Sequence, residues 1–192
     1  MYSRPYPHHG FTISIRPFNA DTDIPVFYEM AGIKEVGCLR PEILNSFHFI
    51  SFTSTVKSYL IFSEGKPVCL IDLSPAIQAD ISDYYPIIPG DYYMSVLPQV
   101  ERLKGKVFLC ALLTCLAFLA NHLTITRVLI EFEEDDNRSI QLAKKAGFQL
   151  LGTSERQGIT LNLFEFPLKN HNKRSSKSPP NRQAYIPFKE LN

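Results

Sequence analysis

The chain has 192 residues, 45% of them hydrophobic, and a formal net charge of +1. This length supports one domain with a substantial core, and the near-zero charge argues against a dedicated nucleic-acid binder. The four cysteines form no CxxC pair, so we expect neither a disulfide framework nor a metal site. With a polar N-terminus and no visible signal peptide, we expect a cytoplasmic protein.

The first 50 residues predict an arm, a strand and two helices. Residues 1–10 carry two prolines and two histidines, and we expect a loose N-terminal arm, with a metal-binding or tag-like histidine pair as the alternative. Residues 11–17 alternate apolar and polar side chains, which is typical of a strand with one buried face. The capping residues at 19–23 predict a helix over 24–31, and a second helix is expected over 40–49.

A hairpin is predicted next, from runs 58–62 and 68–73 on either side of a turn containing Gly65. Asp72 stands out as a carboxylate in an apolar strand. Because an unpaired buried carboxylate is costly, Asp72 either has a cation nearby or faces a cleft. Residues 74–91 predict a loop or broken segment that carries several acidic side chains.

The stretch 92–148 organises the chain. A strand is predicted over 92–97, and an almost wholly apolar helix over 107–120. This helix is shorter than the roughly 20 residues of a membrane span, so we expect it to be buried and predict no membrane association. A second strand over 127–132 leads to a helix over 137–146 that Gly147 ends.

The polar turn before the apolar helix predicts an anion site. Unpaired N–H groups at a helix start and the helix dipole favour a negative ligand. Arg102, Lys104 and Lys106 add full positive charge, and Gly105 lets a backbone approach a ligand closely. This chemistry suits a pyrophosphate, and a solvated loop before a helix is the alternative.

The C-terminal part predicts a second hairpin and a polar tail. Strands are expected over 149–153 and 159–166, with a turn at Gly158. Residues 169–182 are rich in Lys, Asn, Ser and Pro and read as a solvated linker. Residues 184–188 are apolar again and could dock on a surface or a neighbouring subunit, so a homodimer stays open.

The element order and three motifs resemble the GNAT N-acetyltransferases over about residues 11–167. Residues 15–18, with Asp21 and Asp23, are similar to the family's opening strand and helix cap. Residues 102–107 resemble its phosphate loop, (Arg/Gln)-x-x-Gly-x-(Gly/Ala). Residues 136–139 and 146–148 resemble its Asn-x-x-(Ala/Ser)…Gly-Phe ending. The nearest branch is the siderophore-biosynthesis and aminoglycoside 6′-N-acetyltransferase-like group, which often has a glutamate at the position of Asp72.

The resemblance implies an α+β (α/β) fold with a mixed central sheet, splayed between its central strands and flanked by helices. The domain would cover residues 11–168, between the arm and a tail over 169–192. The implied activity is an acyltransferase reaction: an acetyl group passes from acetyl-CoA to an amine in a ternary complex. The implied acceptor is a small cationic molecule with a primary amine or hydroxylamine, with no metal and no nucleic acid involved.

The resemblance also implies a set of acetyl-CoA contacts. The strand edge would pair with the pantetheine, an amide near Val96 would face the thioester oxygen, and the polar turn would hold the pyrophosphate. Asn137 and Ser139 would reach the pantetheine or ribose. The complete set is Met94, Ser95, Val96, Leu97, Arg102, Leu103, Lys104, Gly105, Lys106, Val107, Asn137 and Ser139.

The family resemblance assigns the proton-transfer residues less directly than the acetyl-CoA contacts. Four carboxylates are candidates for the general base, directly or through water: Asp72, Asp91, Glu131 and Glu133. We favour Asp72 and Asp91, which flank the expected acceptor cleft, and Tyr93 or Tyr92 could supply the acid.

Four positions depart from the family pattern. Ser95 replaces a histidine that is common in the nearest branch, Val107 replaces a small residue, and Asp136 replaces an asparagine. Ala143 replaces the tyrosine that many family members use to protonate the leaving thiolate. These departures favour one alternative, a GNAT-shaped module that binds acyl-CoA or a partner without catalysis. A second alternative is protein N-terminal acetylation, which would need a peptide-wide groove free of residues 74–91.

Overall fold

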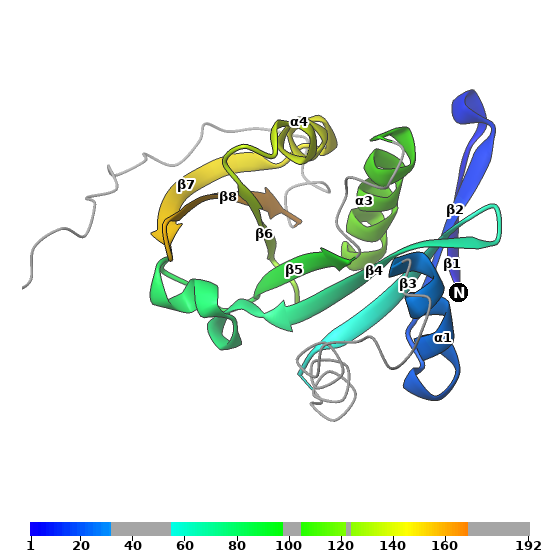
Figure 1. Ribbon diagram of the computed structural model, residues 1–192, viewed down its shortest axis with the longest axis horizontal. Helices are drawn as coiled ribbons and strands as arrows, with labels where there is room; N and C mark the ends of the chain where they lie inside the picture. The colour runs from blue at the N-terminus through cyan, green and yellow to red at the C-terminus, as the bar shows by residue number, and fades with distance from the viewer. Residues whose placement is uncertain (32–54, 98–104, 122–123, 169–192) are drawn as a thin grey trace, which may run out of the picture.

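The computed structural model describes residues 1–31, 55–97, 105–121 and 124–168. Across these ranges the chain forms one eight-stranded sheet in the order β1-β2-β3-β4-β5-β6-β8-β7, with helices on both faces (Figure 1). The predicted fold class is therefore confirmed. The helix expected over 40–49, the loop residues Arg102, Leu103 and Lys104, and the tail 169–192 lie outside the described residues.

The strands are β1 (Tyr2–Tyr6), β2 (Phe11–Pro17), β3 (Lys57–Ser63), β4 (Lys66–Pro75), β5 (Asp91–Leu97), β6 (Arg127–Glu133), β7 (Gln149–Arg156) and β8 (Ile159–Pro167). The helices are α1 (Ala20–Ala31), α3 (Gly105–Leu119) and α4 (Asn137–Ala146), with short 3-10 turns η1 (Pro7–His9), η3 (Ala76–Gln78) and η4 (Asp80–Asp83). Both predicted hairpins are confirmed, and β7 runs three residues beyond its expected end at 153. Within the described ranges, no helix is long and apolar enough to cross a membrane.

The expectation of a loose arm over residues 1–10 is wrong. β1 pairs antiparallel with β2, from Tyr2 opposite Ile15 to Tyr6 opposite Phe11. Tyr2 and Tyr6 pack against the core, and the Tyr6 hydroxyl donates to the Cys110 carbonyl of α3 at 3.0 Å. The prediction was wrong because the prolines were read as a sign of irregular structure. β1 is an edge strand of the sheet, and an edge strand tolerates Pro5.

Different elements pack on the two faces of the sheet. Helices α3 and α4 pack on one face, where α3 buries its predicted apolar surface against residues such as Ile71, Met94 and Val128. On the other face, α1 packs over β3 and β4 through Phe27 and Tyr28. A cover segment, residues 76–87, packs over β6 and β8 on this second face through Ala76, Ile81, Tyr85 and Ile87. Among the described residues, these two covers lie over different strands of the second face.

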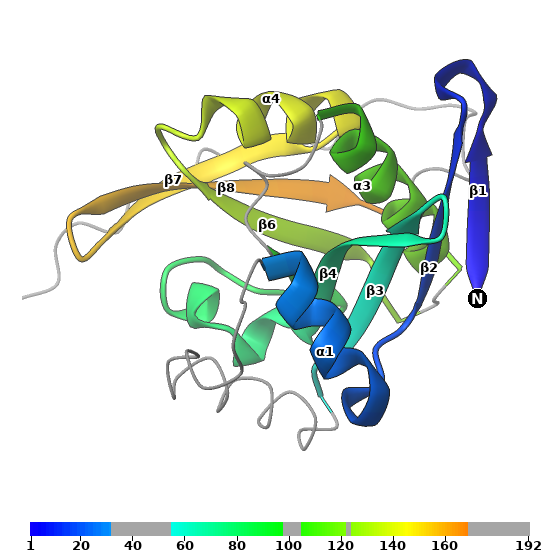
Figure 2. The same cartoon turned by 45° about the vertical axis from the view of Figure 1, so that its right-hand side comes forward.

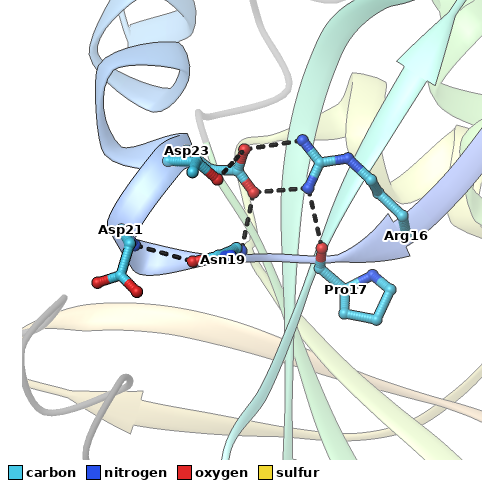
Figure 3. Close-up of polar contacts among 6 residues, drawn as sticks. Arg16, Pro17, Asn19, Asp21 and Asp23 are labelled. Carbon is cyan, nitrogen blue, oxygen red and sulfur yellow. Dashed lines mark hydrogen bonds and ion pairs between the residues drawn. The ribbon is translucent and has the colours of Figure 1, made fainter.

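Helix α1 begins at Ala20 rather than at residue 24, because Asn19 and Asp23 cap it (Figure 3). The Asn19 side chain accepts the Asp21 N–H at 2.9 Å, and Asp23 accepts the Asn19 N–H at 2.8 Å. Both guanidinium Nη atoms of Arg16 donate to Asp23, at 2.6 and 2.7 Å. These bonds lower the pKa of Asp23 and fix the start of α1 to β2.

Helix α4 has the predicted boundaries. The Asp136 side chain accepts the Ser139 N–H at 3.0 Å as the N-cap of α4. Gly147 ends the helix with a φ of 103°, a left-handed conformation that a side chain would strain. The start of α4 is thereby fixed directly after β6.

Candidate functional site

The sheet opens between β5 and β6. The two strands pair in parallel over three positions only, ending at Tyr93 opposite Leu129. Beyond that point β6 continues along β8, whereas Met94 to Leu97 pair with β4 alone. Figure 2 shows the β6–β8–β7 part of the sheet turning away from the strands before it. Among the described residues, the β6-facing edge of 94–97 therefore has no strand partner.

A cleft of about 740 Å³ lies at this opening. Residues 93–96 of β5 and 130–133 of β6 form its walls, and residues 135–138 at the start of α4 lie along it. Arg156 and Leu161, from β7 and β8, complete the lining. Because β-strand side chains alternate between faces, the cleft passes from the α3–α4 face of the sheet to the opposite one.

The predicted acetyl-CoA residues are partly brought together. Met94, Ser95, Val96 and Asn137 line the cleft. Leu97 ends β5 and is 36% exposed. Ser139 does not line the cleft: it is 1% exposed, and no described residue bonds its hydroxyl. Its role as a ligand contact stays a prediction that would need access to this buried position.

The described part of α3 begins within the turn of the anion-site prediction, which stays a prediction. Gly105 is the first residue of the helix, and a Cβ there would meet only the Leu142 methyls at 3.7 Å. Neither backbone conformation nor packing therefore demands glycine at this position. Lys106 is exposed, while Val107 packs against the core cluster.

Asp72 lies one strand behind the cleft. It stands opposite Ser58 of β3 on one side and opposite the cleft-lining Ser95 of β5 on the other. The residue is 8% exposed, and within the described part of the chain its Oδ1 has no hydrogen-bond partner. Burial raises the pKa of Asp72 to about 6, a rise that the nearby Ser58 hydroxyl opposes without a well-aligned bond.

Asp91 lies at the other end of β5, away from the opening. It is 3% exposed and accepts bonds from Arg127 Nε at 2.9 Å and from the Ile88 N–H at 3.0 Å. Arg127 Nη2 also bonds Asp91, and its Nη1 donates to Glu165 at 2.8 Å. Asp91 is not among the cleft-lining residues and lies at the paired end of β5 opposite Arg127, whereas Tyr93 lines the cleft.

A second buried ion pair lies in the cleft wall. Arg156 Nη2 donates to Glu131 Oε1, and the Tyr93 hydroxyl lies 3.5 Å from Glu131 Oε2. Burial raises the pKa of both Glu131 and Tyr93 above their ordinary values. The sequence analysis missed Arg156, because the strand was expected to end at 153; the continued alternation of residues 153–156 was the available signal.

The fold of the chain is similar to the folds of several solved structures. Neither a family model nor a curated protein matches the chain. An uncharacterised Bacillus halodurans protein has a TM-score of 0.70 at 17% identity, covering 88% of this chain and 90% of that one. The aminoglycoside acetyltransferase AAC(6')-Ib in complex with coenzyme A has a TM-score of 0.66 at 17% identity, covering 85% and 99%.

A third similar structure is the Salmonella typhimurium acetyltransferase that modifies the N-terminal serine of ribosomal protein L7/L12. Its TM-score is 0.60 at 13% identity, and the match covers 81% of this chain and 94% of that one. At these identities the similarity establishes the fold, and the acceptor and chemistry must be argued from this chain's own residues.

Proposed function

The chain has the fold of the GNAT acetyltransferases, and we propose that it is an acetyl-CoA-dependent N-acetyltransferase. The acceptor is a primary amine or hydroxylamine of a small cationic molecule, which attacks the thioester directly in a ternary complex. One observation carries this proposal: the edge of residues 94–97, which has no strand partner among the described residues, borders a cleft of about 740 Å³.

The residues present fit acetyl-CoA. A pantetheine arm is an extended chain with two amides, and the free backbone groups of β5 can pair with it as with another strand. The N–H groups of a helix start suit a pyrophosphate, and the described part of α3 begins at Gly105 with the exposed Lys106 beside it. Asn137 lines the cleft. The bound molecule supplies an acetyl group activated as a thioester.

Asp72 is the group we assign to proton removal from the acceptor. Its position opposite the cleft-lining Ser95 supports transfer through a water molecule. The reaction forms a C–N bond, breaks the C–S bond, releases a proton from the acceptor ammonium and delivers one to the departing thiolate. A carboxylate with a pKa of about 6 is ionised at neutral pH, yet more basic than a solvated one.

Tyr93 is the residue that we assign to hydrogen-bond donation to the departing thiolate. It lines the cleft at the last position where β5 pairs with β6. Its raised pKa keeps the phenol protonated, so it can donate a hydrogen bond to a developing negative charge. Asp91, engaged by Arg127, is the weaker candidate for the base.

The acceptor side of the cleft carries several acids. Asp72 and Glu131 lie on this face, and Asp80 of the cover segment raises the pKa values of Glu131 and Tyr93 by its charge. Complementary charge favours a cationic acceptor. The cover segment packs over the β6–β8 part of this face, which favours a small acceptor over the peptide of an N-terminal protein acetyltransferase.

The second candidate function is a module that binds acyl-CoA without turnover. Ala143 is 0% exposed, so α4 supplies no acid at the position where many family members have one. Ser95 likewise offers a hydroxyl where the nearest branch often has an imidazole.

A thiol-release assay with acetyl-CoA over a panel of amines and hydroxylamines distinguishes these functions, with calorimetry of CoA binding beside it. Release with at least one amine supports the transferase. Binding without release supports the module, and the absence of CoA binding overturns both.

A further inference from the structure

Four side chains from four segments form one continuous line of contacts on the acceptor side of the sheet. The Tyr84 ring of the cover segment lies 4.3 Å from Arg156 Cζ of β7. Arg156 donates to Glu131 of β6, and Glu131 in turn lies 3.5 Å from the hydroxyl of Tyr93 on β5. The line therefore runs from the exposed rim to the point where β5 and β6 separate.

The ion pair at the centre of this line is expensive to bury. The side chain of Glu131 is 6% exposed and that of Arg156 is 18% exposed. Desolvation of two charges offsets much of their attraction, so a buried pair is weak evidence for stability. Arg156 also keeps a buried Nε for which no described residue is an acceptor. A role beyond stability accounts better for this pair.

The geometry gives Glu131 a specific orientation. Its Oε1 is held by Arg156, which leaves Oε2 directed to the Tyr93 hydroxyl. Tyr93 belongs both to the cleft lining and to the last paired position before the free strand edge. Ala143 of α4 carries no donor, whereas the Tyr93 hydroxyl belongs to a cleft-lining residue at the fork.

We propose that Glu131 and Arg156 are positioning residues, which hold the Tyr93 hydroxyl at the fork of β5 and β6, where its one proton turns from Glu131 to the departing thiolate. This inference rests on the proposed acetyl transfer. Arg156 fixes the carboxylate, the carboxylate fixes the phenol, and Tyr84 covers the guanidinium. One charge besides this pair acts on both groups: Asp80 of η4 raises the pKa of Glu131 and of Tyr93.

The test is a double-mutant cycle in kcat with the full chain. Tyr93→Phe should lower kcat by about 100-fold, within the usual range for a proton-transfer group. Glu131→Gln should lower kcat by roughly tenfold alone and have no further effect in the Tyr93→Phe background, because both changes remove one contact. Arg156→Lys should retain more activity than Arg156→Met, and KM for acetyl-CoA should stay unchanged throughout.

Glu165→Gln is the matched control, since Glu165 also pairs with an arginine on this sheet but does not line the cleft. It should combine multiplicatively with Tyr93→Phe. A readout independent of turnover is the ¹³Cζ signal of Tyr93, assigned by its loss in Tyr93→Phe. This signal should shift in Glu131→Gln and Arg156→Met and stay in place in Glu165→Gln.

The outcomes separate the two proposals. Absence of turnover by the unaltered chain with every amine overturns the transferase function itself. Turnover in which the Glu131 and Tyr93 effects multiply, or a Tyr93 signal indifferent to Glu131→Gln, overturns the positioning role while the function stands.

Discussion

Asp72 on β4 lies directly opposite Ser95 on β5 in the antiparallel register, with Ser95 in the cleft wall and Asp72 one strand behind it. Asp72 is 8% exposed in this position. Burial raises the pKa of this carboxylate to about 6, which makes it more basic than a solvated one.

Asp72→Asn should therefore lower kcat/KM by roughly 100-fold, the usual loss for a general base. In the unaltered protein, kcat/KM should rise with pH up to about 6, as Asp72 ionises, and then level off. The variant should lose this dependence. Steady-state rates across pH check the prediction, with Asp83→Asn, an exposed acid of η4, as the control. A preserved pH profile in Asp72→Asn would remove Asp72 from the mechanism.

The same residue should cost stability. Its folded pKa of about 6 lies above the ordinary value of 3.8, so the folded state binds more protons between these values. The free energy of unfolding then falls as pH rises through this window, by on the order of 3 kcal/mol. Asp72→Asn should raise Tm above about pH 7 and leave it nearly unchanged below about pH 4. A variant destabilised at neutral pH would contradict this.

Asp91→Asn should act on stability rather than turnover. Arg127 would lose the negative charge of its buried partner, which should lower the free energy of unfolding by about 3 kcal/mol. Denaturant unfolding should show this loss, whereas kcat measured well below the midpoint should stay within about twofold of the unaltered protein. A fall in kcat without loss of stability would restore Asp91 as a catalytic candidate.

The contact between Asp23 and Arg16 should stabilise the start of α1. Asp23→Asn should lower the free energy of unfolding at neutral pH by about 2 kcal/mol, because a charge-assisted bidentate contact is lost. The pKa of Asp23 is lowered in the folded state, so this contribution is present above the unfolded pKa of about 4 and is lost as pH falls. Asp21→Asn in the same turn is exposed and should change little. Equal losses in the two variants would contradict the assignment.

Gly105→Ala should weaken CoA binding without unfolding the protein. The Cβ has room beside Leu142, and alanine favours a helix start more than glycine, so Tm should stay or rise slightly. A methyl group between the backbone and a pyrophosphate should raise the Kd for CoA by about tenfold. Gly158→Ala is the converse control: its φ of 79° predicts lower Tm with unchanged binding. Unchanged CoA affinity in Gly105→Ala would place the phosphates elsewhere.

The amino-acid sequence by itself determined most of the local structure. Alternation marked β2 and the β3–β4 hairpin, an apolar run marked α3, and Asp136 and Gly147 bounded α4. These features are set by residues within a few positions of one another, so a periodicity or a cap predicts them. Together with the family resemblance, they also indicated the fold and the cleft-lining residues of β5.

Only the tertiary structure decided which charged groups share a site. Glu131 meets Arg156 across 25 residues and Asp91 meets Arg127 across 36, through strand pairings that no local pattern specifies. The edge position that admits Pro5 into β1, and the point after Tyr93 where β5 leaves β6, are likewise properties of the assembled sheet. Strand neighbours and register depend on long-range packing, and they place Asp72 behind the cleft and Asp91 away from it.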